Sequence, residues 1–216
     1  MTGMTTMLRR HGATVLERNG RSVAAHFGSP ASEAAVCRSR VGLAERSDRA
    51  TLELGGVPEA VEEALGELGK LGDAAWWVRC SPERAIVRCD GEAAGVSTSM
   101  MLRAEDVTVT DTSHEHAALD LIGPRAHDVW RAHLEQDPGP VVVVWRDETC
   151  VELLVARAQA PALWNGLLAA GDPYGIACVG LEALEHLEVS ERLSRRRART
   201  SPAARGAGGE TRLKST

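Results

Sequence analysis

The order of apolar and polar positions along the chain predicts strand pairs that alternate with single helices. Ala13–Leu16 and Arg21–His26 flank Asn19-Gly20, the strongest short signal for a β-hairpin. A helix is expected to begin at Ser29-Pro30, because serine caps free backbone N–H groups and proline fits the first helical position. This helix is predicted to stop near Gly42.

The same alternation of strands and helices is predicted for the rest of the apolar pattern. Strands are predicted over Arg49–Leu54, Ala74–Arg79, Ala85–Arg88, Asp106–Thr112, Ala117–Ile122, Val141–Trp145 and Val151–Val155. Helices are predicted to begin at Val57-Pro58, Gly123-Pro124, Ala160-Pro161 and Leu181. Strand pairs separated by single helices indicate an α+β fold with mainly antiparallel sheets, and they argue against a doubly wound dinucleotide fold.

The chain divides into three parts. Residues 1–12 are expected to be a flexible N-terminus, and residues 13–193 form the folded domain. Residues 194–216 are rich in Arg, Gly and Ala and have no apolar periodicity, so this tail is predicted to be disordered. Its run Arg195–Arg197 is consistent with a solvated tail or with a segment that attracts an acidic partner.

Composition and charge exclude several classes of function. A net charge of -5 and an aromatic content of 3% argue against a base-stacking groove, so no nucleic-acid partner is expected. The five cysteines contain no C-x-x-C pair, which argues against a zinc ribbon or a disulfide framework. No apolar run reaches the roughly 18 residues of a membrane span. The N-terminal arginines precede no apolar segment, so neither secretion nor a membrane partner is expected, and a cytoplasmic location follows.

Three stretches together resemble one known family. They are FGSPASEAAVCRSRVGLAERSDRATLELGG (Phe27–Gly56), TVTDTSHEHAALDLIGPRAHDVW (Thr108–Trp130) and ETCVELLVARAQAPALWNGLLAAGDPYGIACVGLEALEHLEVS (Glu148–Ser190). In this order they are similar to segments of the glycine-cleavage T-protein (aminomethyltransferase) superfamily. The middle stretch LGDAAWWVRCSPERAIVRCDG is more like the γ subunit of heterotetrameric sarcosine oxidase.

The resemblance implies a two-lobed T-protein-like folate-binding fold with a central cavity. Full T-proteins hold tetrahydrofolate there and transfer a one-carbon unit. This chain lacks their paired aspartates and their C-terminal barrel. Where the family has G-E-x-G-F-E, the chain has D-E-T-C-V-E, so Glu148 and Glu152 stand in register with the acids of the family. Phe27 falls where the family has an aromatic residue that lines the folate pocket, and a plain core role is equally open.

The resemblance leaves three functions open. The first is a γ-like accessory subunit of a sarcosine-oxidase-type complex in one-carbon metabolism, with flavin-dependent oxidase subunits as partners and a degenerate folate site. The second is an active tetrahydrofolate-dependent aminomethyl- or methyltransferase, in which Glu148 grips the pterin ring. The third is a binding module that kept the fold and changed its ligand.

Two further sets of residues could carry chemistry. His114 and His116 would share one face of a strand and offer two metal ligands, but no third ligand is near in sequence, and turn or surface histidines are the favoured interpretation. Ser47, His114 and Asp111 are the residue types of a nucleophile triad, but no G-x-S-x-G elbow supports one. The sequence therefore identifies no catalytic residue and no metal site.

Overall fold

The computed structural model describes residues 3–91, 94–135 and 141–188. The predicted tail over 194–216 and the predicted domain end at 193 lie outside these residues. The strands are β1 (Thr14–Arg18), β2 (Arg21–His26), β3 (Val41–Glu45), β4 (Ala50–Gly56), β5 (Ala75–Ser81), β6 (Arg84–Cys89), β7 (Val107–Asp111), β8 (His116–Ile122), β9 (Val142–Asp147), β10 (Cys150–Ala156) and β11 (Ile176–Cys178). The helices are α1 (Gly3–Arg10), α2 (Pro30–Ser39), α3 (Pro58–Leu68), α4 (Ala94–Met101), α5 (Ala126–Leu134) and α6 (Ala160–Gly171), with 3-10 turns η1 (Gly69–Ala74) and η3 (Asp172–Tyr174) and a last helical stretch over 181–188.

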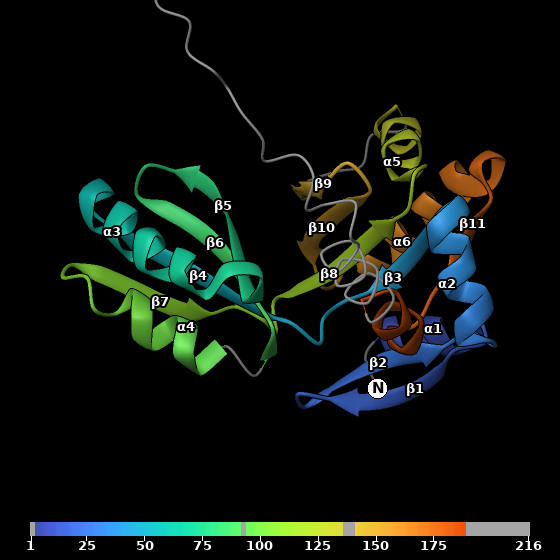
Figure 1. Ribbon diagram of the computed structural model, residues 1–216, viewed down its shortest axis with the longest axis horizontal. Helices are drawn as coiled ribbons and strands as arrows, with labels where there is room; N and C mark the ends of the chain where they lie inside the picture. Colours follow the sequence, from blue (N-terminus) through green and yellow to red (C-terminus); the bar gives the residue numbers. More distant parts are fainter. Residues whose placement is uncertain (1–2, 92–93, 136–140, 189–216) are drawn as a thin grey trace, which may run out of the picture.

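The chain forms two lobes because one pair of neighbouring strands is interrupted by a long insertion. Strands β3 and β8 pair directly in a five-stranded sheet of order β11-β3-β8-β10-β9. The chain between them builds a four-stranded sheet of order β5-β6-β4-β7, on which α3 and α4 pack. Figure 1 shows this second lobe beside the first, joined to it by the β3–β4 and β7–β8 connections. The predicted α+β class with mainly antiparallel sheets is confirmed, because β11 with β3 is the single parallel pairing among the described strands.

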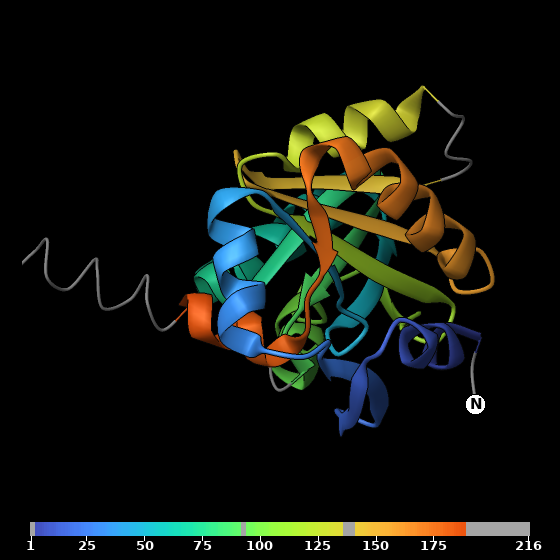
Figure 2. The same cartoon turned by 90° about the vertical axis from the view of Figure 1, so that its right-hand side faces the viewer.

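Each lobe has a hydrophobic core of its own. In the first lobe, Leu121 and Leu153 point from the five-stranded sheet toward α5 and α6, which cover one face of it (Figure 2). In the second lobe, Leu54 and Val87 pack against Leu65 of α3. Side chains alternate across a strand, so the residues next to Leu121 on β8 and next to Leu153 on β10 face the opposite side of the first sheet, toward the second lobe. That opposite face carries the polar side chains of the candidate site.

The N-terminal segment differs from the prediction. Residues 1–12 were expected to be flexible, but Gly3–Arg10 form helix α1. Met4, Met7 and Leu8 recur at helical spacing, and all three are buried in the core of the first lobe. The stripe is only one turn long and lies among threonines and arginines, so it gives little periodic signal.

Local sequence signals account well for the element starts. Asn19 and Gly20 adopt positive φ values of 52° and 72°, which is the backbone that a tight two-residue hairpin requires. The Oγ of Ser29 accepts a hydrogen bond from the backbone N–H of Ser32, so the predicted helix cap is confirmed. Strands β3 and β11 and helix α4 were not predicted, because each is short and carries small residues without a clear period.

Candidate functional site

Five consecutive polar residues cross from one lobe to the other and are all buried. They form the connecting segment, residues 45–49, which runs from the last residue of β3 to the start of β4: Glu45, Arg46, Ser47, Asp48 and Arg49, each between 4% and 6% exposed. Charged side chains are almost never buried to this degree unless they are paired. The segment therefore marks the centre of the molecule as a polar site and not as a continuation of either apolar core.

Arg88 binds the two lobes together at this centre. It lies on β6 of the second lobe, and its Nε donates to the carboxylate of Glu152 on β10 of the first lobe. Its Nη1 donates to the backbone oxygen of Arg49 at 3.1 Å and to Oγ1 of Thr51 at 2.6 Å. Its Nη2 donates to the backbone oxygen of Arg46 at 3.0 Å. The side chains of Arg88 and Glu152 are 2% and 0% exposed, so this is a fully buried ion pair.

The remaining charges extend this pair into the interlobe ion cluster, which we define as Arg46, Asp48, Arg49, Arg88, Asp120 and Glu152. Asp120 and Glu152 are directly opposed on neighbouring strands β8 and β10. Arg49 Nη1 lies 3.3 Å from Asp120 Oδ2 and 3.8 Å from Glu152 Oε2. Arg46 Nε lies 2.9 Å from Asp48 Oδ1. Three arginines thus meet three carboxylates, and the cluster neutralises itself.

Burial and neighbouring charge set the protonation of the cluster. Burial, together with the facing carboxylate of Glu152, raises the pKa of Asp120. Burial is the largest influence on Asp48 and would raise its pKa, but the charge and hydrogen bond of Arg46, together with the charges of Arg49 and Arg88, outweigh burial and lower that pKa. Arg46 is held protonated, since the charge and hydrogen bond of Asp48, together with the charges of Asp120 and Glu152, exceed the cost of burial and raise the pKa of its guanidinium. The charged form of this salt bridge is therefore the stable one.

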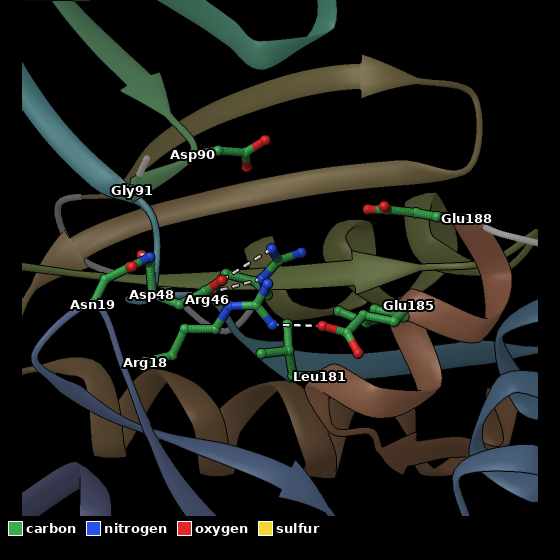
Figure 3. A pocket seen from close by; sticks show the side chains of 10 residues that line it. Arg18, Asn19, Arg46, Asp48, Asp90, Gly91, Leu181, Glu185 and Glu188 are labelled. Atoms are coloured by element: carbon green, nitrogen blue, oxygen red, sulfur yellow. Dashed lines mark hydrogen bonds and ion pairs between the residues drawn. The ribbon is translucent and has the colours of Figure 1, made fainter. Parts of the chain in front are cut away.

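Aromatic residues and small cavities border the cluster. Arg49 and Arg146 each lie over the ring of Trp76, at 4.7 Å and 4.0 Å from its centroid. A cavity of about 170 Å³ lies beside Arg46 and Asp48, and the ion pair between Arg18 and Glu185 forms part of its lining (Figure 3). Its size falls below the roughly 300 Å³ at which small-molecule sites begin.

The structure does not bring the three predicted folate residues together. Glu148 is exposed at the tip of the β9–β10 turn. Glu152 is buried in the interlobe ion cluster and already bonded to Arg88. Phe27 packs in the core of the first lobe and stacks on Trp164, with ring centroids 6.2 Å apart. Phe27 is thus half-buried against the core of the first lobe, away from the exposed Glu148.

A larger cavity also borders the connecting segment, at Ser47. This basic pocket, of about 510 Å³, is lined by Thr5, Glu17, Gly20, Arg21, Ser22, Ser47, His114 and Arg157. Beside it, Glu45 Oε1 accepts a hydrogen bond from the backbone N–H of Ser47 at 3.0 Å. Burial raises the pKa of Glu45 to about 7. A carboxyl group with such a pKa next to a cavity is a common feature of binding and catalytic sites.

His114 in the β7–β8 turn and His116 at the start of β8 form no catalytic pair or metal site with the other described residues. His114 and Ser47 line the same cavity, but the Oγ of Ser47 has no hydrogen-bond partner among the described residues, so no nucleophile–base pair is formed. His116 Nδ1 faces the backbone oxygen of Thr112 at 3.2 Å. Within residues 3–91, 94–135 and 141–188, no group of three or more potential metal ligands occurs. The same residues contain no helix long and apolar enough to span a membrane.

The arginines that build both sites carry no clear signal in the sequence. Arg46, Arg49 and Arg88 sit in or beside short apolar strands, and arginine in such positions normally faces solvent. One signal was available: the polar run over residues 45–49 separates two segments that are both apolar enough to be buried. The pairing partners cannot be read from the sequence, because they come from strands far apart along the chain.

Comparison with known proteins identifies the fold. No protein-family model and no curated protein sequence matches the chain. Among solved structures, it is similar to the glycine cleavage system aminomethyltransferase T from Bartonella henselae, with 19% identity and a TM-score of 0.64, over 82% of this chain and 58% of that one. It is also similar to a chain of the heterotetrameric sarcosine oxidase from Corynebacterium sp. U-96, with 18% identity and a TM-score of 0.51, over 69% of this chain and 96% of that one.

These likenesses identify the class of fold. The α+β body with mainly antiparallel sheets has the T-protein-like fold that the sequence motifs predicted. The chain spans less than two thirds of the length of the aminomethyltransferase that it matches. At these identities the comparison shows the fold, and the function depends on what the site itself can do.

Proposed function

We propose that the chain is a T-protein-like accessory protein of one-carbon metabolism, located in the cytoplasm, in which internal ion pairs have replaced the grip on tetrahydrofolate. The observation that carries the proposal is the bonding of Glu152. Its Oε1 accepts from Arg88, its Oε2 faces Arg49 at 3.8 Å, and its side chain is fully buried. Oε2 has no hydrogen-bond partner among the described residues, but Oε1 is taken by Arg88, so the two free oxygens that a bidentate bond to a ligand requires are not both available.

The loss of folate binding follows from hydrogen-bond energetics. A pterin ring presents two adjacent donors, which a buried carboxylate with two free oxygens can accept. To serve in this way, Glu152 would have to break its bond with Arg88 and leave a buried guanidinium without its counter-ion, which costs about 3–5 kcal/mol. Glu148 is free but lies in solvent, where water competes for both of its oxygens. Neither predicted carboxylate is therefore suited to hold folate in this conformation.

The second half of the proposal is a partner of the flavin-dependent oxidase type. Strand β9 ends the five-stranded sheet, and in the described part of the chain its outer edge has no partner strand. Trp145 on this strand is 47% exposed and stacks on His127, with ring centroids 4.1 Å apart. An open strand edge with an exposed tryptophan is a favourable place for another chain to bind. Likeness to nearly the whole of a sarcosine oxidase chain supports an oxidase as that partner.

Association with purified catalytic subunits of a sarcosine-oxidase-type enzyme tests this function. Sedimentation velocity is expected to show a stable complex, and Trp145→Ser is expected to weaken it at least about tenfold. Leu102→Ser is the matched control, because Leu102 is 53% exposed but belongs to the second lobe. If the subunits and the chain sediment separately, or if both variants lose binding equally, the accessory role is wrong.

An active tetrahydrofolate-dependent transferase is the rival function, and the likeness to aminomethyltransferase T favours it. The two functions differ in their requirement for folate. A transferase must bind tetrahydrofolate near its working concentration, whereas an accessory chain with the interlobe ion cluster intact need not bind it at all.

A further inference from the structure

Arg21 and Arg157 lie together on the wall of the basic pocket without counter-ions. Arg21 belongs to β2 and Arg157 directly follows β10, so the fold brings them together from distant parts of the chain. Among the described residues, neither forms an ion pair with a carboxylate. Every other guanidinium buried at the centre of this protein has one, as the interlobe ion cluster shows.

Both arginines are held in place by the backbone of the β7–β8 turn. Arg157 Nε donates to the backbone oxygen of His114 at 3.1 Å, and its Nη2 donates to the backbone oxygens of Ser113 at 3.1 Å and His116 at 2.9 Å. Arg21 Nη1 donates to the same Ser113 oxygen at 2.5 Å. The hydrogen bonds fix the orientation of the two side chains, but a carbonyl oxygen carries only a partial charge. Asp111 and Glu45 act on Arg21, and Glu45 acts on Arg157, without forming an ion pair with either arginine, so the compensation of these charges is incomplete.

The electrostatics of the pocket favour an anion. Burial, and after it the positive charge of Arg157, lowers the pKa of Arg21, so the two guanidinium groups repel each other. The acid that lines the pocket, Glu17, is exposed and bonded to the Oγ of Ser22. A negative group between the arginines would remove their repulsion and gain charge-assisted hydrogen bonds.

Ser47 supplies a third polar group. Its side chain is 4% exposed and lines the same pocket, yet its Oγ has no hydrogen-bond partner in the described part of the chain. A buried hydroxyl without a partner is costly, by about 1–3 kcal/mol, so such a group usually serves a ligand or a water molecule. Its backbone N–H is already used by Glu45, which leaves the hydroxyl as the group available to a ligand.

We propose that the basic pocket binds the oxyanion group of a small organic molecule, a carboxylate or a phosphate, between Arg21 and Arg157 and within reach of Ser47. The volume of about 510 Å³ exceeds that of a bare ion and falls in the range of small-molecule sites, so an organic body accompanies the charged group. The pocket is separate from the interlobe ion cluster, and this inference does not depend on the proposed accessory function.

Isothermal titration with three probes tests the proposal on the full chain at constant ionic strength. Succinate carries carboxylates, glycerol 3-phosphate carries a phosphate, and glycerol is the uncharged control. At least one of the two anions is expected to bind with a dissociation constant of about 1 mM or tighter, and glycerol is not. The anion that binds more tightly identifies the class of ligand. Absence of binding by both anions up to about 20 mM overturns the proposal.

Variants then locate the site. Arg157→Met and Arg21→Met are each expected to weaken binding at least about tenfold, and Ser47→Ala severalfold. Arg103→Met is the matched control, since Arg103 is 68% exposed on the second lobe, and it is expected to leave binding unchanged. If the methionine variants do not fold, Arg157→Lys and Ser47→Ala test the site in their place. Arg157→Lys keeps the positive charge but removes the planar guanidinium group that can form two parallel hydrogen bonds to the anion. Unchanged binding in Arg157→Lys and Ser47→Ala, or equal losses in Arg103→Met, would show that the anions bind elsewhere.

Discussion

Replacement of Arg88 by methionine removes the side chain that joins the two lobes. Arg88→Met keeps a long apolar chain of similar length on β6 but deletes the guanidinium that bonds Glu152. Glu152 would then be a buried carboxylate whose nearest remaining cation is Arg49, at 3.8 Å. The backbone oxygens of Arg46 and Ala50 would lose the N–H groups that now reach them, at 3.0 Å and 3.2 Å.

The expected cost is large because the pair is completely buried. Breaking a buried ion pair by removing one partner destabilises a protein by about 3–5 kcal/mol, since the remaining charge is left without compensation. The lost hydrogen bonds to backbone oxygens act in the same direction. Such a loss is a large fraction of the about 5–15 kcal/mol by which domains are normally stable.

Urea unfolding followed by circular dichroism measures this cost. The matched control is Arg84→Met on the same strand, because Arg84 forms an exposed ion pair with Glu53. The control is expected to cost less than about 1 kcal/mol. The double variant Arg88→Met with Glu152→Leu is expected to be more stable than the sum of the two single losses predicts, since no charge then remains unpaired. If Arg88→Met costs no more than Arg84→Met, the interlobe ion cluster does not hold the lobes together.

Four further substitutions test individual features of the account. Burial raises the pKa of Glu45 from 4.5 to about 7, and Asp48 and Arg157 are the charges that face this carboxyl group. The protonated carboxyl group therefore contributes its full stability below the unfolded pKa, and this stability is lost as the pH rises through 7. Glu45→Gln should remove this pH dependence and should stabilise the protein at pH 8 by up to about 3 kcal/mol, measured by urea unfolding. Burial lowers the pKa of His133, so stability should fall as the pH is lowered below about 6.5, and His133→Leu should abolish that part of the pH profile. A Cβ at Gly42 would lie 2.5 Å from Sγ of Cys37, so Gly42→Ala should cost about 1–3 kcal/mol, and a smaller cost would show that the contact relaxes. Glu148→Gln should change the unfolding free energy by less than about 0.5 kcal/mol, because Glu148 is exposed; a larger change would show a structural role.

Local signals in the sequence were sufficient for most elements of the fold. The Asn19-Gly20 turn, the Ser29 cap and the strand pairs β5–β6 and β9–β10 depend on neighbouring residues, and their signals lie within a few positions of each other. Strand β11 could not be predicted in this way, because its three residues form a strand only by pairing with β3, which lies far away in the chain. Helix α1 was not predicted for a related reason, because Leu8 is buried by elements that come much later in the chain, including α6.

The site was predicted less well than the fold. Register with the family motif located Glu152 on the correct strand, but it could not show that Arg88 occupies that carboxylate, because their pairing depends on how the two lobes meet. The pairing of Arg21 and Arg157 in one pocket depends in the same way on the β7–β8 turn, whose backbone oxygens orient both side chains. Motifs indicate which residues a fold family uses. Which buried charged side chains pair with one another depends on the complete folded structure.

The most direct test of the central claim is a titration of the purified full chain with tetrahydrofolate, kept reduced and followed by isothermal calorimetry. The account predicts no saturable heat up to about 1 mM ligand, because the interlobe ion cluster occupies the carboxylate that folate would need. Saturable binding with a dissociation constant below about 100 µM, weakened by Glu152→Gln, would contradict it.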